Sequence, residues 1–205
     1  MSKARWLLLS ALTVALGADS LVWQPSAAAA QEQLNVSGYV NVPGRKIPYL
    51  IRHLPLNSFP DLPPAIQAEL SRRGCLIPQT YEAHQPENVV HGSFEKAGSS
   101  DWAVLCSANG NVSLLVFFAS APEKPFVLTT VAATERLQPH HLTGVMGFNW
   151  GIDEETPAQV RGAQFGMEPR PPKLDHDALG DSVIEHKTVY RYYTKGGWTV
   201  VETME

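Results

Sequence analysis

Histidine side chains are the first groups of this sequence that could hold a metal ion or move a proton. They cluster at His140-His141 and within Asp175-His176-Asp177. A zinc site built from His140 or His141, His176 and an aspartate would need about four converging ligands. Adjacent histidines on a loop point apart, however, and the chain contains no H-E-x-x-H motif. We therefore predict exposed loop histidines, with no metal site and no cofactor.

Serine side chains are the second group that could carry out chemistry. Ser99 and Ser100 lie in a predicted turn, with His91 and Asp101 close to them in sequence. The chain has no G-x-S-x-G elbow, but a Ser-His-Asp triad is defined by geometry rather than by spacing. A secreted hydrolase with a site assembled from loops therefore remains an alternative function.

The acidic run Asp153-Glu154-Glu155 could supply paired carboxylates, since glycosidases use two carboxyl groups about 5–9.5 Å apart. The run stands directly before Thr156-Pro157, a sequence that favours a turn. We interpret it as a solvated turn rather than as a catalytic pair.

Aromatic side chains gather near the C-terminus, where Tyr190, Tyr192 and Tyr193 surround Arg191 and Trp198 follows. Alternate side chains of a strand point to opposite faces, so Tyr193 and Arg191 share one face. Because Tyr, Trp and Arg dominate the energetics of binding surfaces, the candidate binding surface is Tyr193, Arg191 and Trp198. The residues leave open whether these rings contact a ligand or cover the sheet as core.

Residues 1–30 have the organisation of a signal peptide. Lys3 and Arg5 form a positive n-region, Trp6–Leu16 is a run of apolar and small residues, and Ala28-Ala29-Ala30 offers an A-x-A cleavage site. The apolar run is shorter than the ~20 residues that a membrane span needs, which disfavours a retained anchor. We predict cleavage before Gln31. Residues 31–205 then form a single β-rich domain, exported to the periplasm or the cell exterior and without a membrane span.

Export changes the interpretation of the two cysteines, Cys75 and Cys106. In an oxidising compartment an isolated pair of cysteines most simply forms one disulfide. The alternatives are two buried thiols or a metal-binding pair, although the CxxC spacing typical of metal sites is absent. We predict a Cys75–Cys106 disulfide.

Apolar alternation and turn signals predict mostly β-structure. Asn35–His53 reads as a hairpin around Pro43-Gly44, and Asn109-Gly110 and Gly196-Gly197 mark two further turns, because glycine accepts positive φ angles. The other predicted strands are Val89–Phe94, Trp102–Ser107, Val112–Phe118, Phe126–Ala133, Val145–Asp153, Ala158–Phe165, Ser182–Glu185, Thr188–Thr194 and Trp198–Thr203.

One clear helix is predicted between the first hairpin and Cys75. Leu62, Ile66 and Leu70 recur on one helical face. Asp61 can cap the N-terminus, and Gly74 suits the residue after the C-terminus.

The pairing of strand and helix follows from side-chain parity. Trp102, Val104 and Cys106 share one face of their strand, and we expect that face to contact the helix. The disulfide would then clamp the helix to the sheet. The predicted fold class is α+β and β-rich, an antiparallel β-meander or sandwich with one short helix.

Residues 88–118 contain a G-x-F sequence, a short loop with a glycine and an aspartate that leads into an apolar strand, at Gly92, Phe94, Gly98 and Asp101. In these positions the segment resembles one unit of the FG-GAP/VCBS repeats, which build β-propellers. In that family the loop often binds calcium through several aspartates, whereas here only Glu95 and Asp101 are acidic and Lys96 stands between them. The resemblance therefore implies a hairpin geometry and no calcium site. A full propeller needs at least about four similar blades, so it is not expected from one unit.

Three features lie along the chain: a predicted helix ending in Arg73-Gly74-Cys75, the strand Trp102–Cys106, and the aromatic strand Tyr190–Tyr193 followed by Gly197-Trp198. In these features the chain as a whole is similar to secreted bacterial proteins of uncharacterised function. This similarity implies export and a disulfide, and it supplies no activity.

Charge and composition exclude some functional classes. The formal net charge is −4 and no long basic stretch is present, so a nucleic-acid partner is not expected. Hydrophobic residues make up 44% of the chain, which is enough to build a core. We predict an exported, non-enzymatic binding or interaction module whose partner is a protein or a glycan. A secreted hydrolase and a structural envelope protein are the alternatives.

Overall fold

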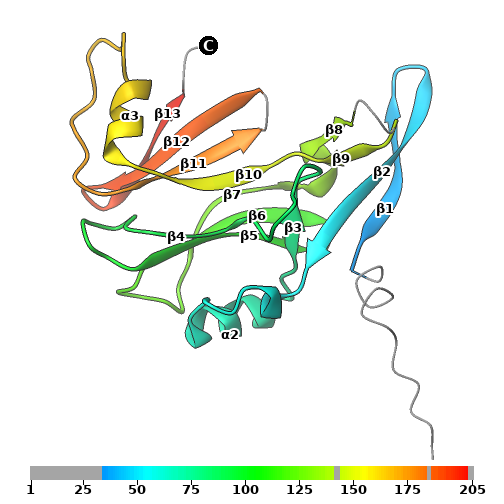
Figure 1. Cartoon of the computed structure of the whole chain (residues 1–205), viewed down its shortest axis with the longest axis horizontal. Helices are drawn as coiled ribbons and strands as arrows, with labels where there is room; N and C mark the ends of the chain where they lie inside the picture. The colour runs from blue at the N-terminus through cyan, green and yellow to red at the C-terminus, as the bar shows by residue number, and fades with distance from the viewer. Residues whose placement is uncertain (1–33, 141–143, 184–185, 203–205) are drawn as a thin grey trace, which may run out of the picture.

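The computed structural model describes residues 34–140, 144–183 and 186–202, and Figure 1 shows their arrangement. The described residues form three β-sheets, two short α-helices and two 3-10 turns, joined by loops. The predicted signal peptide, His141 and Glu185 lie outside the described residues. Among the described residues, no helix has the length and apolar character needed to cross a membrane.

The first sheet contains the N-terminal hairpin in the order β1-β2-β9-β8, with β3 paired to β2. Pro43-Gly44 forms the turn as predicted, with Val42 opposite Arg45 and Gly44 at a φ of +81°. The strands are β1 (Val36–Val42), β2 (Arg45–Leu54), β3 (Ile77–Gln79), β8 (Leu137–Pro139) and β9 (Met146–Phe148).

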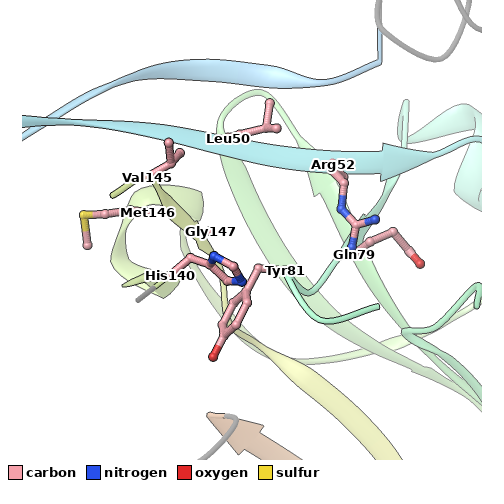
Figure 2. A pocket seen from close by; sticks show the side chains of 8 residues that line it. All are labelled: Leu50, Arg52, Gln79, Tyr81, His140, Val145, Met146 and Gly147. Carbon is pink, nitrogen blue, oxygen red and sulfur yellow. The ribbon is translucent and has the colours of Figure 1, made fainter. Parts of the chain in front are cut away.

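A parallel pairing joins this hairpin to the middle of the chain. Tyr49 of β2 stands opposite Met146 of β9, whereas the other described strand pairs are antiparallel. Gly147 follows in β9, and a Cβ there would lie 2.4 Å from the Cβ of Tyr81. Only glycine therefore lets the segment containing Tyr81 cross β9 so closely (Figure 2).

The second sheet is an antiparallel meander in the order β4-β5-β6-β7. Asn109 and Gly110 have φ angles of +51° and +78°, so the predicted Asn-Gly turn is present between β5 and β6. Asp101 is fully buried at the start of β5, where its carboxylate accepts hydrogen bonds from the backbone N–H groups of Ala119 and Glu95. The strands are β4 (Val89–Gly92), β5 (Asp101–Ala108), β6 (Asn111–Phe117) and β7 (Phe126–Ala132).

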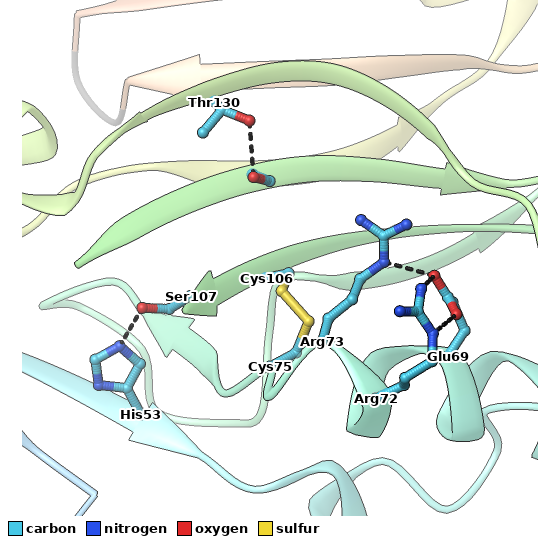
Figure 3. The surroundings of a disulfide bond; sticks show 9 residues. His53, Glu69, Arg72, Arg73, Cys75, Cys106, Ser107 and Thr130 are labelled. Atoms are coloured by element: carbon cyan, nitrogen blue, oxygen red, sulfur yellow. Dashed lines mark hydrogen bonds and ion pairs between the residues drawn. A yellow bond between two sulfur atoms is a disulfide. The ribbon is translucent and has the colours of Figure 1, made fainter. Parts of the chain in front are cut away.

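Helix α2 (Pro64–Arg72) covers the outer face of the second sheet. The predicted disulfide is present and fixes Cys75, just after the helix, to Cys106 of β5 (Figure 3). Their Cα atoms are 5.0 Å apart, within the range that disulfides adopt. The face of β5 predicted to contact the helix does so. Buried in this interface are Leu62, Ile66, Leu70, Cys75, Val104, Cys106, Leu115 and Phe117.

The two ends of α2 differ in how well the sequence predicted them. Gly74 has a φ of +70°, as expected for the residue after a helix C-terminus. The predicted cap by Asp61 is wrong, because Pro63 occupies the cap position and no side chain bonds to the first turn. Pro64 begins the helix, where a missing N–H costs no hydrogen bond.

The third sheet packs over the inner face of the second in the order β10-β11-β12-β13. Phe94, Leu105, Trp150, Ile152 and Leu179 are among the buried residues between these layers. The α+β, β-rich fold class is confirmed. The strands are β10 (Gly151–Glu155), β11 (Ala178–Val183), β12 (Lys187–Thr194) and β13 (Gly197–Glu202).

Helix α3 (Pro157–Ala163) replaces the strand predicted over Ala158–Phe165 and adds a second helix to the one expected. Thr156 and Gln159 form a capping box, and Pro157 begins the helix. Val160 then packs on the outer face of the third sheet. A helix of seven residues shows too little apolar periodicity to be recognised, although the T-x-x-Q signal was readable.

Two smaller predictions also differ from the structure. The acidic run Asp153-Glu154-Glu155 belongs to strand β10 and is not a solvated turn, because its backbone pairs with β11. The last hairpin turns at Lys195-Gly196 rather than at Gly196-Gly197, since Thr194 pairs with Gly197.

Candidate ligand-binding site

A cavity of about 710 Å³ lies beside the hairpin formed by β12 and β13. We call it the hairpin cavity. Three parts of the chain surround it: the β4–β5 loop, the proline-rich connection before β11, and the end of the hairpin itself. Its size is within the range of pockets that hold small organic ligands. The lining residues are Glu95, Lys96, Pro171, Pro172, Lys173, Leu174, Asp175, His176, Tyr192, Tyr193, Thr194, Lys195 and Thr199.

Three lysines from three separate loops border the hairpin cavity. Lys96, Lys173 and Lys195 are all exposed, and none forms an ion pair within the described part of the chain. The two acidic residues of the rim are already engaged. Glu95 accepts a hydrogen bond from the Ser120 hydroxyl at 3.0 Å, and Asp175 pairs with His176. Uncompensated cations therefore gather at one hollow of a chain whose net charge is −4.

Lys195 occupies an unusual backbone position for a lysine. Its φ is +52°, in the left-handed region, and Gly196 follows at +79°. Asn, Asp and Gly are the residues that adopt such turn positions at low cost. Asparagine would adopt this turn conformation at lower energy. The lysine places an ammonium group at the cavity at some cost in backbone conformational energy.

His176 is a further polar residue of the cavity wall. Its Nε2 lies 2.8 Å from the Tyr193 carbonyl oxygen, which can only accept, so Nε2–H donates. Its Nδ1 lies 2.7 Å from Asp175 Oδ1, and the hydrogen bond from His176 lowers the pKa of that carboxyl. Both ring nitrogens of His176 are thus engaged, which fixes the ring at the cavity wall. The predicted exposed loop histidine is wrong here, since His176 is buried.

The predicted surface residues take up different places. Tyr193 borders the hairpin cavity, and its ring packs in a cluster with Phe118, Phe126 and Trp198. The Nε of Arg191 donates to Asp181 Oδ2 at 2.7 Å. The buried carboxylate of Asp181 thus fixes the Arg191 side chain. Neither Arg191 nor Trp198 lines the hairpin cavity.

The candidate catalytic residues are also partly brought together. His91 Nε2 lies 2.8 Å from the Ser100 hydroxyl. Burial and the neighbouring Asp177 raise the pKa of Glu154, and His91 opposes that rise. Ser99 is not part of this group, because its hydroxyl bonds to Asp101 and to the backbone of Lys96.

The remaining predictions concern metals and the acidic run. Within residues 34–140, 144–183 and 186–202, no group of three His, Cys, Asp or Glu residues could hold a metal ion. Burial raises the pKa of Asp153, with a further contribution from Glu87. Burial also raises the pKa of Glu155, assisted by Asp153.

Sequence reasoning did not find the lysines of the hairpin cavity. They lie about a hundred residues apart at the extremes, and each is an ordinary exposed lysine when considered alone. The one readable signal was Lys195, a lysine where the turn sequence calls for asparagine or glycine.

No family model, curated protein or solved structure matched this chain when it was compared with each. Fold and site therefore define the class of protein by themselves. It is a disulfide-linked, β-rich α+β protein with a cavity between the third sheet and the loops that flank it.

Proposed function

We propose that this protein is an exported binding module that holds an acidic glycan in the hairpin cavity. The observation that carries the proposal is the convergence of Lys96, Lys173 and Lys195, unpaired among the described residues, on one cavity. Export is supported by the signal-peptide organisation of residues 1–30 and is consistent with the disulfide.

The chemistry of the wall suits a sugar acid. Leu174, Pro171 and Pro172 offer apolar surface against which the C–H face of a sugar ring can pack. Thr194 and Thr199 add hydroxyl groups that can donate to or accept from sugar hydroxyls. The lysines supply the charge that a uronate carboxylate needs, and such cations act mainly through an electrostatic field that salt screens.

Replacing the lysines is expected to weaken binding of trigalacturonate at least about tenfold, which corresponds to about 1.4 kcal/mol. The variant is Lys96→Gln, Lys173→Gln and Lys195→Asn together, and asparagine preserves the left-handed turn position. Isothermal titration calorimetry at low salt measures the effect.

The matched control is Lys187→Gln, because Lys187 is paired with Glu202 and lies outside the cavity lining. It should leave the affinity unchanged. Methyl esterification of the trigalacturonate should reduce binding as strongly as the triple variant. Equal affinity of the triple variant and the unmodified protein would rule the proposal out.

A secreted hydrolase is the second candidate, favoured by the 2.8 Å contact between Ser100 Oγ and His91 Nε2. The geometry argues against an efficient one. Both residues are exposed, and neither lines the hairpin cavity. The raised pKa of Glu154 also weakens it as a carboxylate partner for His91.

Under the binding proposal, hydrolysis of p-nitrophenyl acetate should be equally slow for the unmodified protein and for Ser100→Ala. A triad serine contributes several powers of ten to the rate. A hydrolysis rate that depends on Ser100 would therefore replace the binding proposal with the hydrolase.

A further inference from the structure

A second cavity, of about 370 Å³, lies where β2, β9 and the segment after β3 meet (Figure 2). We call it the Arg52 pocket. Leu50 and Arg52 come from β2, Tyr81 from the segment after β3, and Met146 from β9. None of these residues lines the hairpin cavity, so the two sites are separate.

Arg52 is the only arginine or lysine among the described residues that line this pocket. Its Nη2 donates to the carbonyl oxygens of Thr80 at 2.6 Å and Ala83 at 3.0 Å. These two bonds fix the direction of the guanidinium group and use the donors of one nitrogen. An arginine has five N–H donors. The donors on Nε and Nη1 make no hydrogen bond to the described residues and remain available to a ligand.

No carboxylate compensates the charge of Arg52 in the described part of the chain. Arg52 is half-buried and takes part in no ion pair there. Glu87 lies in the segment between β3 and β4, but its carboxylate accepts hydrogen bonds from the backbone N–H and the hydroxyl of Thr80. Glu82 is exposed and forms no ion pair with the described residues. A partly desolvated cation without a neighbouring negative charge costs free energy, and an incoming carboxylate would remove that cost.

The other walls of the pocket are apolar or aromatic. The rings of Tyr81 and His140 meet edge to face with their centroids 5.1 Å apart. Leu50 and Met146 also line the pocket, and Leu50 remains 41% exposed. A ligand with an apolar body would cover this surface while its charged end reached Arg52.

We propose that the Arg52 pocket binds a small monocarboxylate, with its carboxylate on the outward donors of Arg52 and its apolar body between Leu50, Met146 and the Tyr81 ring. Arginine suits this role because its planar group presents paired N–H donors to two carboxylate oxygens. The proposal does not depend on the glycan site, since it rests on different residues and a different cavity.

The test uses octanoate and phenylacetate as probes, with octanamide and phenylacetamide as their neutral counterparts. Ligand-observed NMR titration of the full protein should show saturable binding of at least one acid and at least tenfold weaker binding of its amide. The two acids distinguish a chain-shaped from a ring-shaped apolar body. Arg52→Gln should weaken the bound acid at least tenfold.

Arg52→Gln also removes two bonds to backbone carbonyls, so a second variant keeps the test independent of folding. Leu50→Trp fills the pocket from an exposed position and leaves Arg52 and its bonds intact. It should abolish binding of the acid, whereas Lys195→Asn in the hairpin cavity should not change it. The proposal fails if the amide binds as tightly as the acid, if Leu50→Trp binds normally, or if neither acid binds below about 10 mM.

Discussion

Trp150→Ala is expected to lower the free energy of unfolding by about 3–5 kcal/mol, the range for truncating a fully buried large aromatic side chain. Trp150 is 0% exposed and lies in the core between the second and third sheets. Its indole Nε1–H donates to Asp181 Oδ1 at 2.7 Å, and the Arg136 guanidinium lies 4.4 Å from the centre of the ring. Urea denaturation followed by circular dichroism measures the loss.

Trp150→Phe separates the contribution of the buried ring to stability from the contribution of its N–H group. Phenylalanine retains most of the apolar contact but cannot donate to Asp181, whose carboxylate would then keep, among the described side chains, the hydrogen bond from Arg191 alone. A buried acceptor left with one fewer donor costs about 1–3 kcal/mol. The phenylalanine variant should therefore fall between the unmodified protein and Trp150→Ala. A loss below about 1 kcal/mol for Trp150→Ala would show that this core tolerates a large cavity.

Removal of the disulfide is the second change with a large expected effect. The double variant Cys75→Ser, Cys106→Ser should lose about 2–4 kcal/mol of stability, since the bridge restricts the unfolded chain. In the folded protein the bridge also holds the C-terminal end of α2 against β5. Guanidinium denaturation of the oxidised protein and of the double variant gives the difference.

Two controls accompany the disulfide experiment. Reduced unmodified protein should match the double variant, because both lack the same covalent link. Denatured protein that has not been reduced should contain no titratable thiol. Two titratable thiols would contradict the bridge and would show that Cys75 and Cys106 are free buried thiols.

Local sequence signals predicted the elements whose contacts are close in the chain. Pro43-Gly44 and Asn109-Gly110 determine their hairpins because few backbone conformations suit those pairs. The parity of β5 likewise identified the face that meets α2, because a strand has only two faces and Cys106 had to reach Cys75.

The two cavities could not be predicted in the same way. The lysines of the hairpin cavity come together only because a loop before β5, a connection before β11 and a turn after β12 meet in space. The Arg52 pocket depends on the parallel pairing of Tyr49 with Met146, and no local pattern in either strand selects that partner. Such contacts depend on the whole fold, whereas turn chemistry and periodicity describe segments of about ten residues.

The pairing of β2 with β9 also orders the events of folding. The N-terminal hairpin closes on itself through adjacent residues, so it can form as soon as both of its strands are available. Its docking onto β9 must wait until a segment about a hundred residues further along has been made and placed. During that interval β2 lacks its β9 partner, and the backbone of Leu50 lies on an unpaired strand edge. The Arg52 pocket consequently cannot exist before the chain has been made as far as β9, and any ligand it holds would bind only a chain of at least that length.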